Sequence, residues 1–200
     1  MNKARVESFS DGVFAFAITL LVLGIPIPNL ARVDDHQLRS GLIRALHQLV
    51  PYITSFATIG IIWLNHHAMF HAVERVDHPT LILNLMLLLV VSFIPFPTAV
   101  LGRYGALPSS AFLYGCILTA LGITYSMLSF YILKSGLRRK EVLDRSRWER
   151  LRDFLGTMTY PTATMLSLRY PRVGVTIYFL LAAFYLLPSR GLPLTEESTI

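Results

Sequence analysis

The residues of this chain that could do chemistry gather in two short stretches, each beside a long apolar segment. The first stretch contains Arg5, Phe9, Ser10 and Asp11, and the second contains Trp63, Asn65, His66 and His67. A carboxylate at the edge of a bilayer is costly unless another group satisfies it, and histidine titrates near physiological pH. The two stretches therefore predict either a polar clamp between helices or groups that sense or carry protons.

The spacing of these residues does not favour metal binding or catalysis. His67 and His71 have a spacing that could hold zinc with a third ligand, but no acidic helix motif accompanies them. The sequence contains no Gly-x-Ser-x-Gly, His-Glu-x-x-His or phosphate-loop motif. We therefore expect a protein that is not an enzyme and that needs no metal or cofactor.

The composition is that of a membrane protein. Of the 200 residues, 54% are hydrophobic and only 15% are charged, whereas soluble domains carry about 25% charged residues. No alternation of the kind that makes a barrel strand is present, so the predicted class is an all-α membrane protein. The net charge of +6 reflects basic cytoplasmic segments, and nucleic acid is not an expected partner.

Six segments meet or approach the roughly 20 mostly apolar residues that a transmembrane helix needs. They lie at about 12–30, 51–73, 79–101, 111–133, 154–168 and 173–189, in a single transmembrane domain that covers residues 1–200. The fifth is short, rich in threonine and interrupted by Pro161. Lysine and arginine are densest at 134–153, so the positive-inside rule places that segment and the N-terminus in the cytoplasm.

Two helices are expected outside the spans. The first of these helices can be capped by Asp34 or Asp35. Its apolar residues recur at helical spacing up to Val50, so we expect the helix to continue into the second span. The second is a surface helix at 138–153, with Trp148 near the lipid headgroups.

The two polar stretches should lie at the same depth, because the first span leaves the cytoplasm and the second returns to it. Arg5 and Asp11 point about 240° apart on one helix and are poor partners for each other. We therefore expect Ser10 or Asp11 to bond Trp63, His66 or His67 on the neighbouring helix.

An apolar stripe follows the first polar stretch. Phe16, Leu20, Leu23 and Ile27 lie at i, i+4, i+7 and i+11, and Thr19 lies beside them. Such a stripe usually packs a helix bundle. If several copies faced one axis, the same side chains would form a constriction that closes a pore by dewetting.

The sequence from Arg5 to Asp11 has the form Arg-x-x-x-Phe-Ser-Asp and continues as Gly-Val-Phe-Ala-Phe-Ala-Ile-Thr-Leu-Leu-Val-Leu. This stretch, together with Trp-Leu-Asn-His-His at 63–67, resembles the transmembrane protein 175 family of potassium channels in its prokaryotic single-repeat form. The resemblance implies passive potassium conduction without a cofactor. It also implies a pore lined by the first helices of four equivalent units, and hence a homotetramer.

Matched by position, the resemblance implies a constriction at Phe16, Leu20 and Leu23, with Thr19 influencing the choice of cation. Relatives tend to carry isoleucine at the lowest ring, where this chain has Phe16. Four phenyl rings would close a narrower gate or turn aside. The expected location is the cell membrane, the inner membrane of a prokaryote, with lipid, potassium ions and further copies of the chain as partners.

Two other functions are compatible with the sequence. A proton-coupled transporter would use Asp11 with the histidines, but the first span has no ionisable residue at mid-membrane depth and the third has only the neutral Asn84. A scaffold protein with a basic cytoplasmic loop would leave the Arg-x-x-x-Phe-Ser-Asp motif unexplained.

Overall fold

A computed structural model of the protein describes residues 2–30, 33–105, 107–137 and 158–186. Its elements are all helices: α1 (Lys3–Leu20), α2 (Asp35–Ala45), α3 (Leu49–His71), α4 (His78–Phe93), α5 (Pro95–Tyr104), α6 (Pro108–Lys134), a helix at 158–167, and α8 (Pro171–Leu186). Short 3₁₀ turns follow α1 at Leu21–Gly24 and α2 at Leu46–Gln48. The predicted surface helix at 138–153 lies outside the described residues.

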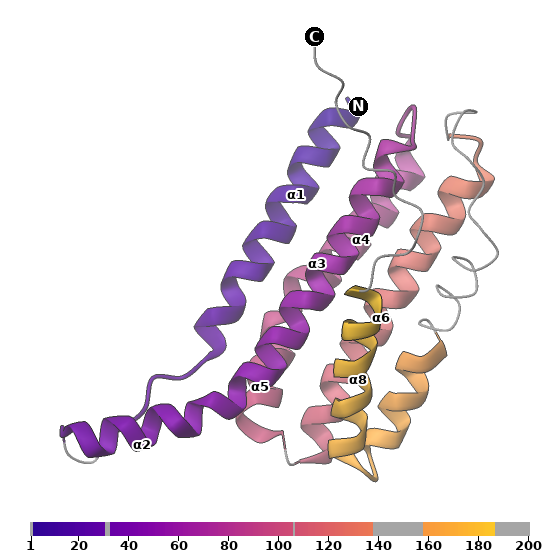
Figure 1. Ribbon diagram of the computed structural model, residues 1–200. Coiled ribbons are helices and arrows are strands. Elements are labelled where there is room, and N and C mark those ends of the chain that lie inside the picture. The colour runs from indigo at the N-terminus through magenta and orange to yellow at the C-terminus, as the bar shows by residue number, and fades with distance from the viewer. Residues whose placement is uncertain (1, 31–32, 106, 138–157, 187–200) are drawn as a thin grey trace.

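The long helices form a bundle in which consecutive helices run in opposite directions (Figure 1). Four helical segments in the described residues are long and apolar enough to cross a membrane, namely Lys3–Gly24, Asp35–His71, His78–Tyr104 and Pro108–Lys134. The predicted class, an all-α membrane protein, is therefore confirmed. The helix at 158–167 and α8 are shorter, and a total of six crossings stays a prediction.

The first helix begins and ends earlier than the predicted span at 12–30. Asn2 caps it by accepting a hydrogen bond from the backbone N–H of Ala4 at 3.0 Å, so the polar motif is itself helical. Beyond Gly24 the chain is extended, because Pro26 and Pro28 lack the N–H that a helix needs and disfavour helical geometry in the residues before them. The helical part thus covers residues 3–24, and the membrane crossing at 12–30 stays a prediction.

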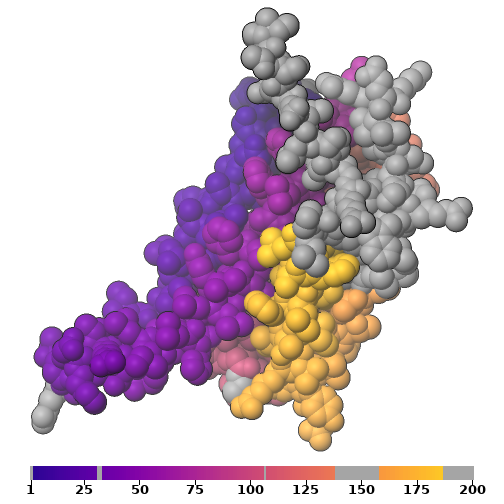
Figure 2. Space-filling view, in the orientation of Figure 1, coloured from indigo at the N-terminus to yellow at the C-terminus, as the bar shows by residue number. Residues whose placement is uncertain are grey.

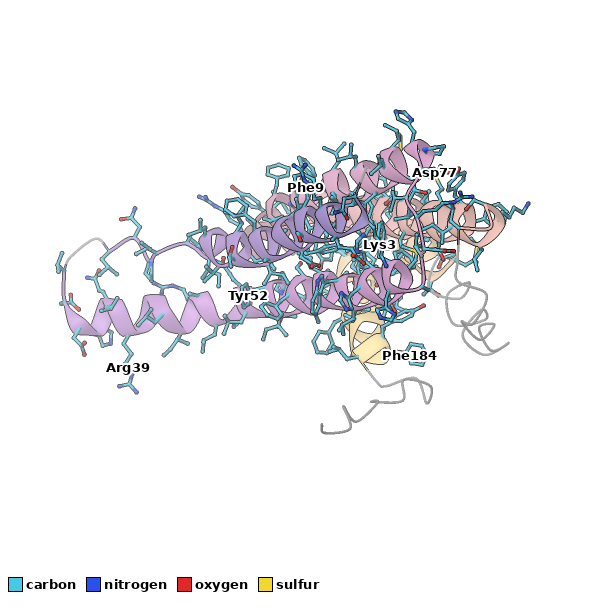
Figure 3. The ribbon with its side chains drawn as sticks, turned by 90° about the horizontal axis from the view of Figure 1, so that it is seen from above. Lys3, Phe9, Arg39, Tyr52, Asp77 and Phe184 are labelled. Atoms are coloured by element: carbon cyan, nitrogen blue, oxygen red, sulfur yellow. The ribbon has the colours of Figure 1, made fainter. Side chains whose placement is uncertain are left out.

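The helix α2 forms an arm that projects from the bundle before the chain turns into α3 (Figure 2). Asp34 caps it by accepting from the backbone N–H of Gln37 at 2.8 Å. Arg39 extends from it away from the bundle (Figure 3). The predicted helix ahead of the second span, and its continuation into that span, are confirmed.

The predicted third span is two helices rather than one. The helices α4 and α5 meet at Ile94, directly before Pro95 and Pro97. Neither proline can donate to the carbonyl four residues earlier, so the helical ladder breaks there. Thr98 partly repairs the break, because its hydroxyl and its backbone N–H both donate to the Ile94 carbonyl, at 2.8 and 3.2 Å.

A buried set of hydroxyl groups connects the helices in the half of the bundle away from the N-terminus. We call it the hydroxyl cluster, and it consists of Ser55, Thr98, Tyr114, Thr164 and Tyr178. The Ser55 hydroxyl lies 2.7 Å from that of Thr98 and 2.8 Å from that of Tyr114. Tyr178 donates to Thr164 at 3.3 Å, which ties α8 to the helix at 158–167. The cluster thereby links helices along most of the chain.

Candidate functional site

The predicted stripe on α1 faces away from the bundle core. Phe16 is 65% exposed and Leu23 is 76% exposed, with Leu20 partly exposed between them. On the opposite side of the helix, Phe14 and Leu21 are only 1% and 2% exposed. The protomer therefore uses one side of α1 for its own packing and leaves the Phe16 side free.

Thr19 and Ile27 differ in their relation to this stripe. Thr19 is exposed on α1, and its hydroxyl donates to the Phe16 carbonyl at 2.8 Å. The proton of this hydroxyl is thereby occupied, and its oxygen remains an acceptor on the exposed side. Ile27 was predicted to continue the stripe, but it lies in the extended segment beyond the helix and is 91% exposed. The stripe therefore ends at Leu23.

A hydrogen bond joins the first polar stretch to the second. The indole Nε1 of Trp63 on α3 donates to the Asp11 Oδ1 on α1 at 2.8 Å. Charge-assisted bonds of this kind are about twice as strong as neutral ones. The Asp11 carboxylate at the membrane edge is thus satisfied by the neighbouring helix. Trp63 is one of the three partners that the sequence predicted for it.

A second, buried chain of hydrogen bonds runs beside it through three helices. The Ser10 hydroxyl on α1 donates to the Val6 carbonyl at 2.8 Å and accepts from the Asn84 amide nitrogen on α4 at 2.9 Å. The Asn84 Oδ1 lies 2.8 Å from the His66 Nε2 on α3. We call Ser10, Asp11, Trp63, His66 and Asn84 together the motif cluster.

The direction of these hydrogen bonds shows which nitrogen of the His66 ring donates. The Asn84 Oδ1 can only accept, so the His66 Nε2 carries a proton and donates to it. Phe70 stacks on the ring with a centroid distance of 4.3 Å, and Phe14 lies 5.3 Å away. His66 is 1% exposed, and its Nδ1 has no hydrogen-bond partner among the described residues. The ring is therefore a buried donor clamped between aromatic side chains.

Other residues of the predicted polar network lie outside these bonds. His67 is exposed, with its ring centroid 5.9 Å from that of Trp63. Phe9 is 57% exposed. In the part of the chain that the structure describes, Arg5 and Asn65 form no side-chain hydrogen bond or ion pair. Of the predicted network, only Ser10, Asp11, Trp63 and His66 form hydrogen bonds between helices in the described residues.

Asn84 is the member that the sequence-based prediction missed. In the sequence it is an isolated neutral residue of the third span, yet in the structure it bridges Ser10 and His66. A signal was present, since an amide within an otherwise apolar span must find a partner. The partner could not be found without knowing which face of α4 meets α1 and α3.

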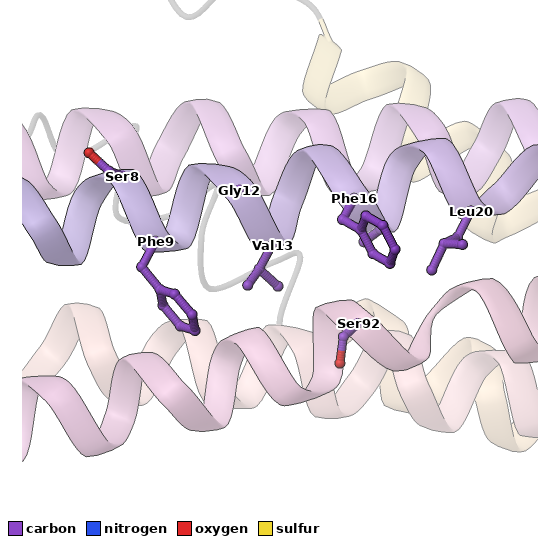
Figure 4. Close-up of a pocket in the computed structure, with 8 residues that line it drawn as sticks. Ser8, Phe9, Gly12, Val13, Phe16, Leu20 and Ser92 are labelled. Carbon is purple, nitrogen blue, oxygen red and sulfur yellow. The ribbon is translucent and has the colours of Figure 1, made fainter.

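A groove of about 520 Å³ opens between α1 and the end of α4. Its walls are mostly apolar and consist of Ser8, Phe9, Gly12, Val13, Phe16, Ala17, Leu20 and Ser92. Figure 4 shows Phe16 and Leu20 extending from α1 toward the helix that carries Ser92. Phe16 and Leu20, two of the three predicted constriction residues, therefore border a groove formed by their own protomer.

The hydrogen bonds of the motif cluster position one helix of the bundle. The described residues contain no group of three or more histidine, cysteine or acidic side chains that could hold a metal ion. The motif cluster holds α1 against α3 and α4, while the Phe16 stripe stays exposed. The structure therefore shows one helix fixed to its neighbours, with an apolar side that the protomer itself does not cover.

Comparison with known proteins gives the family. The family model described as endosomal/lysosomal potassium channel TMEM175 matches residues 5–95. A potassium channel from Streptomyces collinus is 37% identical over 196 residues, which cover 92% of this chain and 92% of that protein. The chain belongs to the TMEM175 family, as the Arg-x-x-x-Phe-Ser-Asp motif predicted.

Two further relatives show the range of the family. The crystal structure of a lysosomal potassium-selective channel TMEM175 homologue from Chamaesiphon minutus superposes with a TM-score of 0.78 at 34% identity, over 92% of this chain and 95% of that one. An endosomal/lysosomal proton channel TMEM175 from Bos taurus is 38% identical over 101 residues, which are 48% of this chain and 21% of that protein. The family thus includes proteins named for potassium and for protons.

Proposed function

We propose that the protein is a potassium-permeable channel, passive and free of cofactors, whose pore is lined by α1. The observation that carries the proposal is the division of α1 into a buried side and an exposed apolar stripe, with Phe16 at 65% and Leu23 at 76% exposure. The names of the full-length relatives support potassium as the ion.

A single α1 cannot surround a pore, so the proposal includes a homotetramer. Around a four-fold axis, Phe16, Leu20 and Leu23 form three apolar rings at successive depths. Narrow apolar rings exclude water and thereby block ions, which makes the constriction itself the gate. Thr19 presents a hydroxyl oxygen beside these rings, where an acceptor can replace part of the hydration shell of a cation and so influence ion choice.

The proposed topology has six crossings, a cytoplasmic N-terminus and one transmembrane domain over residues 1–200 in the cell membrane of a prokaryote. The N-terminal end of α1, the turn between α3 and α4 and the end of α6 lie at the same end of the bundle (Figure 1). The basic segment at 134–153 follows α6, so the positive-inside rule supports this end as cytoplasmic. Lipid and potassium ions are the proposed partners.

Potassium flux through purified protein in liposomes tests the proposal. We expect flux down a potassium gradient at constant pH, and an increase in flux for Leu20→Ala and Leu23→Ala because the rings widen. Leu180→Ala is the matched control, since Leu180 is an exposed leucine on α8, away from the proposed pore. The absence of flux, or an equal effect of Leu180→Ala, would contradict the proposed pore.

The same liposomes test proton transport, which the family members named proton channels make the second candidate. A proton gradient is imposed without a potassium gradient, and internal pH is followed with a dye. Proton entry without potassium flux would favour a proton channel. Potassium movement that requires an opposing proton gradient would favour the proton-coupled transporter.

A further inference from the structure

The groove beside Phe16 has the size and surface of a receptacle for an aromatic ring. A dry cavity of about 150 Å³ in another protein holds benzene. The groove here measures about 520 Å³ and is lined mostly by apolar side chains. The groove therefore has room beside its walls for the ring of Phe16, which is already one of the residues that line it.

The residues around Phe16 leave this space open. A Cβ placed on Gly12, one turn before Phe16, would meet no atom within 4 Å. On the facing helix, Ser92 has a short side chain whose hydroxyl donates to its own Leu89 carbonyl at 2.9 Å. A ring that enters the groove consequently meets no unsatisfied donor.

Phe16 can reach two positions from the same backbone. In an α-helix, long side chains adopt χ1 near 180° or near −60°, and these two rotamers aim the ring in different directions across the helix surface. Figure 4 shows the ring extending toward the helix that carries Ser92. The stripe that contains Phe16 is otherwise exposed, so the second rotamer has open space before it.

We propose that Phe16 is a two-position gate whose ring lies in the groove between α1 and α4 when the pore conducts and turns toward the pore axis when it closes. Gly12 and Ser92 are the residues that make room for it. This inference rests on the proposed channel function and explains how a chain with phenylalanine at its lowest ring can still open. It assigns the groove to a side chain of the same protomer, rather than to a lipid or a second copy.

Filling the groove tests the proposal in planar bilayers. Ser92→Phe should lower the open probability at least tenfold, because the ring of Phe16 loses its receptacle. The double variant Ser92→Phe with Phe16→Ala should restore opening, since no ring remains to be accommodated. Gly60→Leu is the control, because it adds bulk at another position where a Cβ meets nothing within 4 Å. Unchanged opening in Ser92→Phe, or a loss that persists without Phe16, would overturn the proposal.

A measurement that does not need conduction separates this inference from the channel function. With 4-fluorophenylalanine at position 16 alone, the ¹⁹F NMR spectrum should show two ring environments, and Ser92→Phe should deplete one. A single environment that Ser92→Phe does not move would overturn the gate. Two ring environments in a protein without potassium flux would contradict the channel function but leave the two positions of Phe16 intact. Chemical cross-linking measures the oligomeric state of Ser92→Phe. If this variant dissociates, a second copy fills the groove, and the gate is overturned.

Discussion

The motif cluster and the hydroxyl cluster satisfy buried polar groups in different ways. Besides the Ser10 hydroxyl, the motif cluster contains a carboxylate, an imidazole, an indole and an amide, and each of these four has a limited set of donors and acceptors. The hydroxyl cluster contains only hydroxyl groups, which donate and accept at once and rotate to suit. Exchanging a member should therefore be more disruptive in the motif cluster, unless the exchange adds volume to the tightly packed hydroxyl cluster.

The two clusters also hold different helices. The motif cluster joins α1 to α3 and α4, so it positions the helix with the exposed stripe. The hydroxyl cluster joins α3, α5, α6, α8 and the helix at 158–167 to one another, and none of its bonds involves α1. Damage to the first should alter the proposed pore as well as stability, whereas damage to the second should act on stability alone.

The largest effect is expected from adding volume to the hydroxyl cluster. In Gly115→Ala, the new Cβ would overlap the Tyr178 hydroxyl and the Thr164 Oγ1, so α6 must separate from its neighbours. We expect a loss of about 3 kcal/mol in the free energy of unfolding, typical of an overpacked core. Gly122→Ala in the same helix meets nothing within 4 Å and should be neutral or stabilising by up to about 1 kcal/mol. Thermal unfolding in detergent measures both, and equal melting temperatures would contradict the close packing.

The next effect tests the rule that directional groups are harder to replace. Asn84→Leu leaves the His66 Nε2–H buried without an acceptor, which should cost about 2 kcal/mol and alter potassium flux through the displacement of α1. Thr98→Val should cost only about 1 kcal/mol and leave flux unchanged, since the Ser55 hydroxyl keeps its partner in Tyr114 at 2.8 Å and the Ile94 carbonyl keeps the backbone N–H of residue 98. A larger cost for Thr98→Val than for Asn84→Leu would reverse the comparison.

The charge within the motif cluster should have a smaller effect than its geometry. In Asp11→Asn, the amide oxygen can still accept from the Trp63 indole, so only the charge assistance is lost, at about 1 kcal/mol. Trp63→Phe removes the bond altogether and should destabilise more. Melting temperatures of the two variants in detergent give the comparison, and an Asp11→Asn protein as stable as the wild type would show that the carboxylate charge contributes nothing.

The smallest effect concerns acid sensitivity outside the membrane, where Asp77 caps α4. Burial favours the neutral form, but hydrogen bonds from Thr80 and Tyr131 outweigh it and hold the pKa of Asp77 below its ordinary value. A lowered pKa in the folded state means that Asp77 stabilises above the unfolded pKa of 3.8, and that this stabilisation fades as pH falls through the folded value.

In Asp77→Asn, the melting temperature should therefore fall less steeply as pH is lowered below 5. Asparagine caps the helix equally well but does not titrate. A fall as steep as that of the wild type would assign the acid sensitivity to another group.

The sequence alone was sufficient for the class, the family and the pairing of its two polar stretches. Composition identified a helical membrane protein, because a bilayer requires long apolar segments whatever their packing. The motif from Arg5 to Asp11 identified the family, and antiparallel spans placed Asp11 at the depth of Trp63. Helical periodicity likewise predicted that Phe16 on α1 and Leu23 in the 3₁₀ turn after it are both exposed on the same stripe, since that depends only on the helix repeat.

Only the tertiary structure decided which polar groups meet and where space remains. Asn84 joins the motif cluster because one face of α4 meets α1 and α3, and the rotation of a helix about its own axis is set by packing rather than by depth. The hydroxyl cluster could not be predicted, because the spans contain many serine, threonine and tyrosine residues and only helix packing decides that Ser55 meets Tyr114. The groove beside Phe16 is a property of two helices together, so neither of their sequences contains it alone.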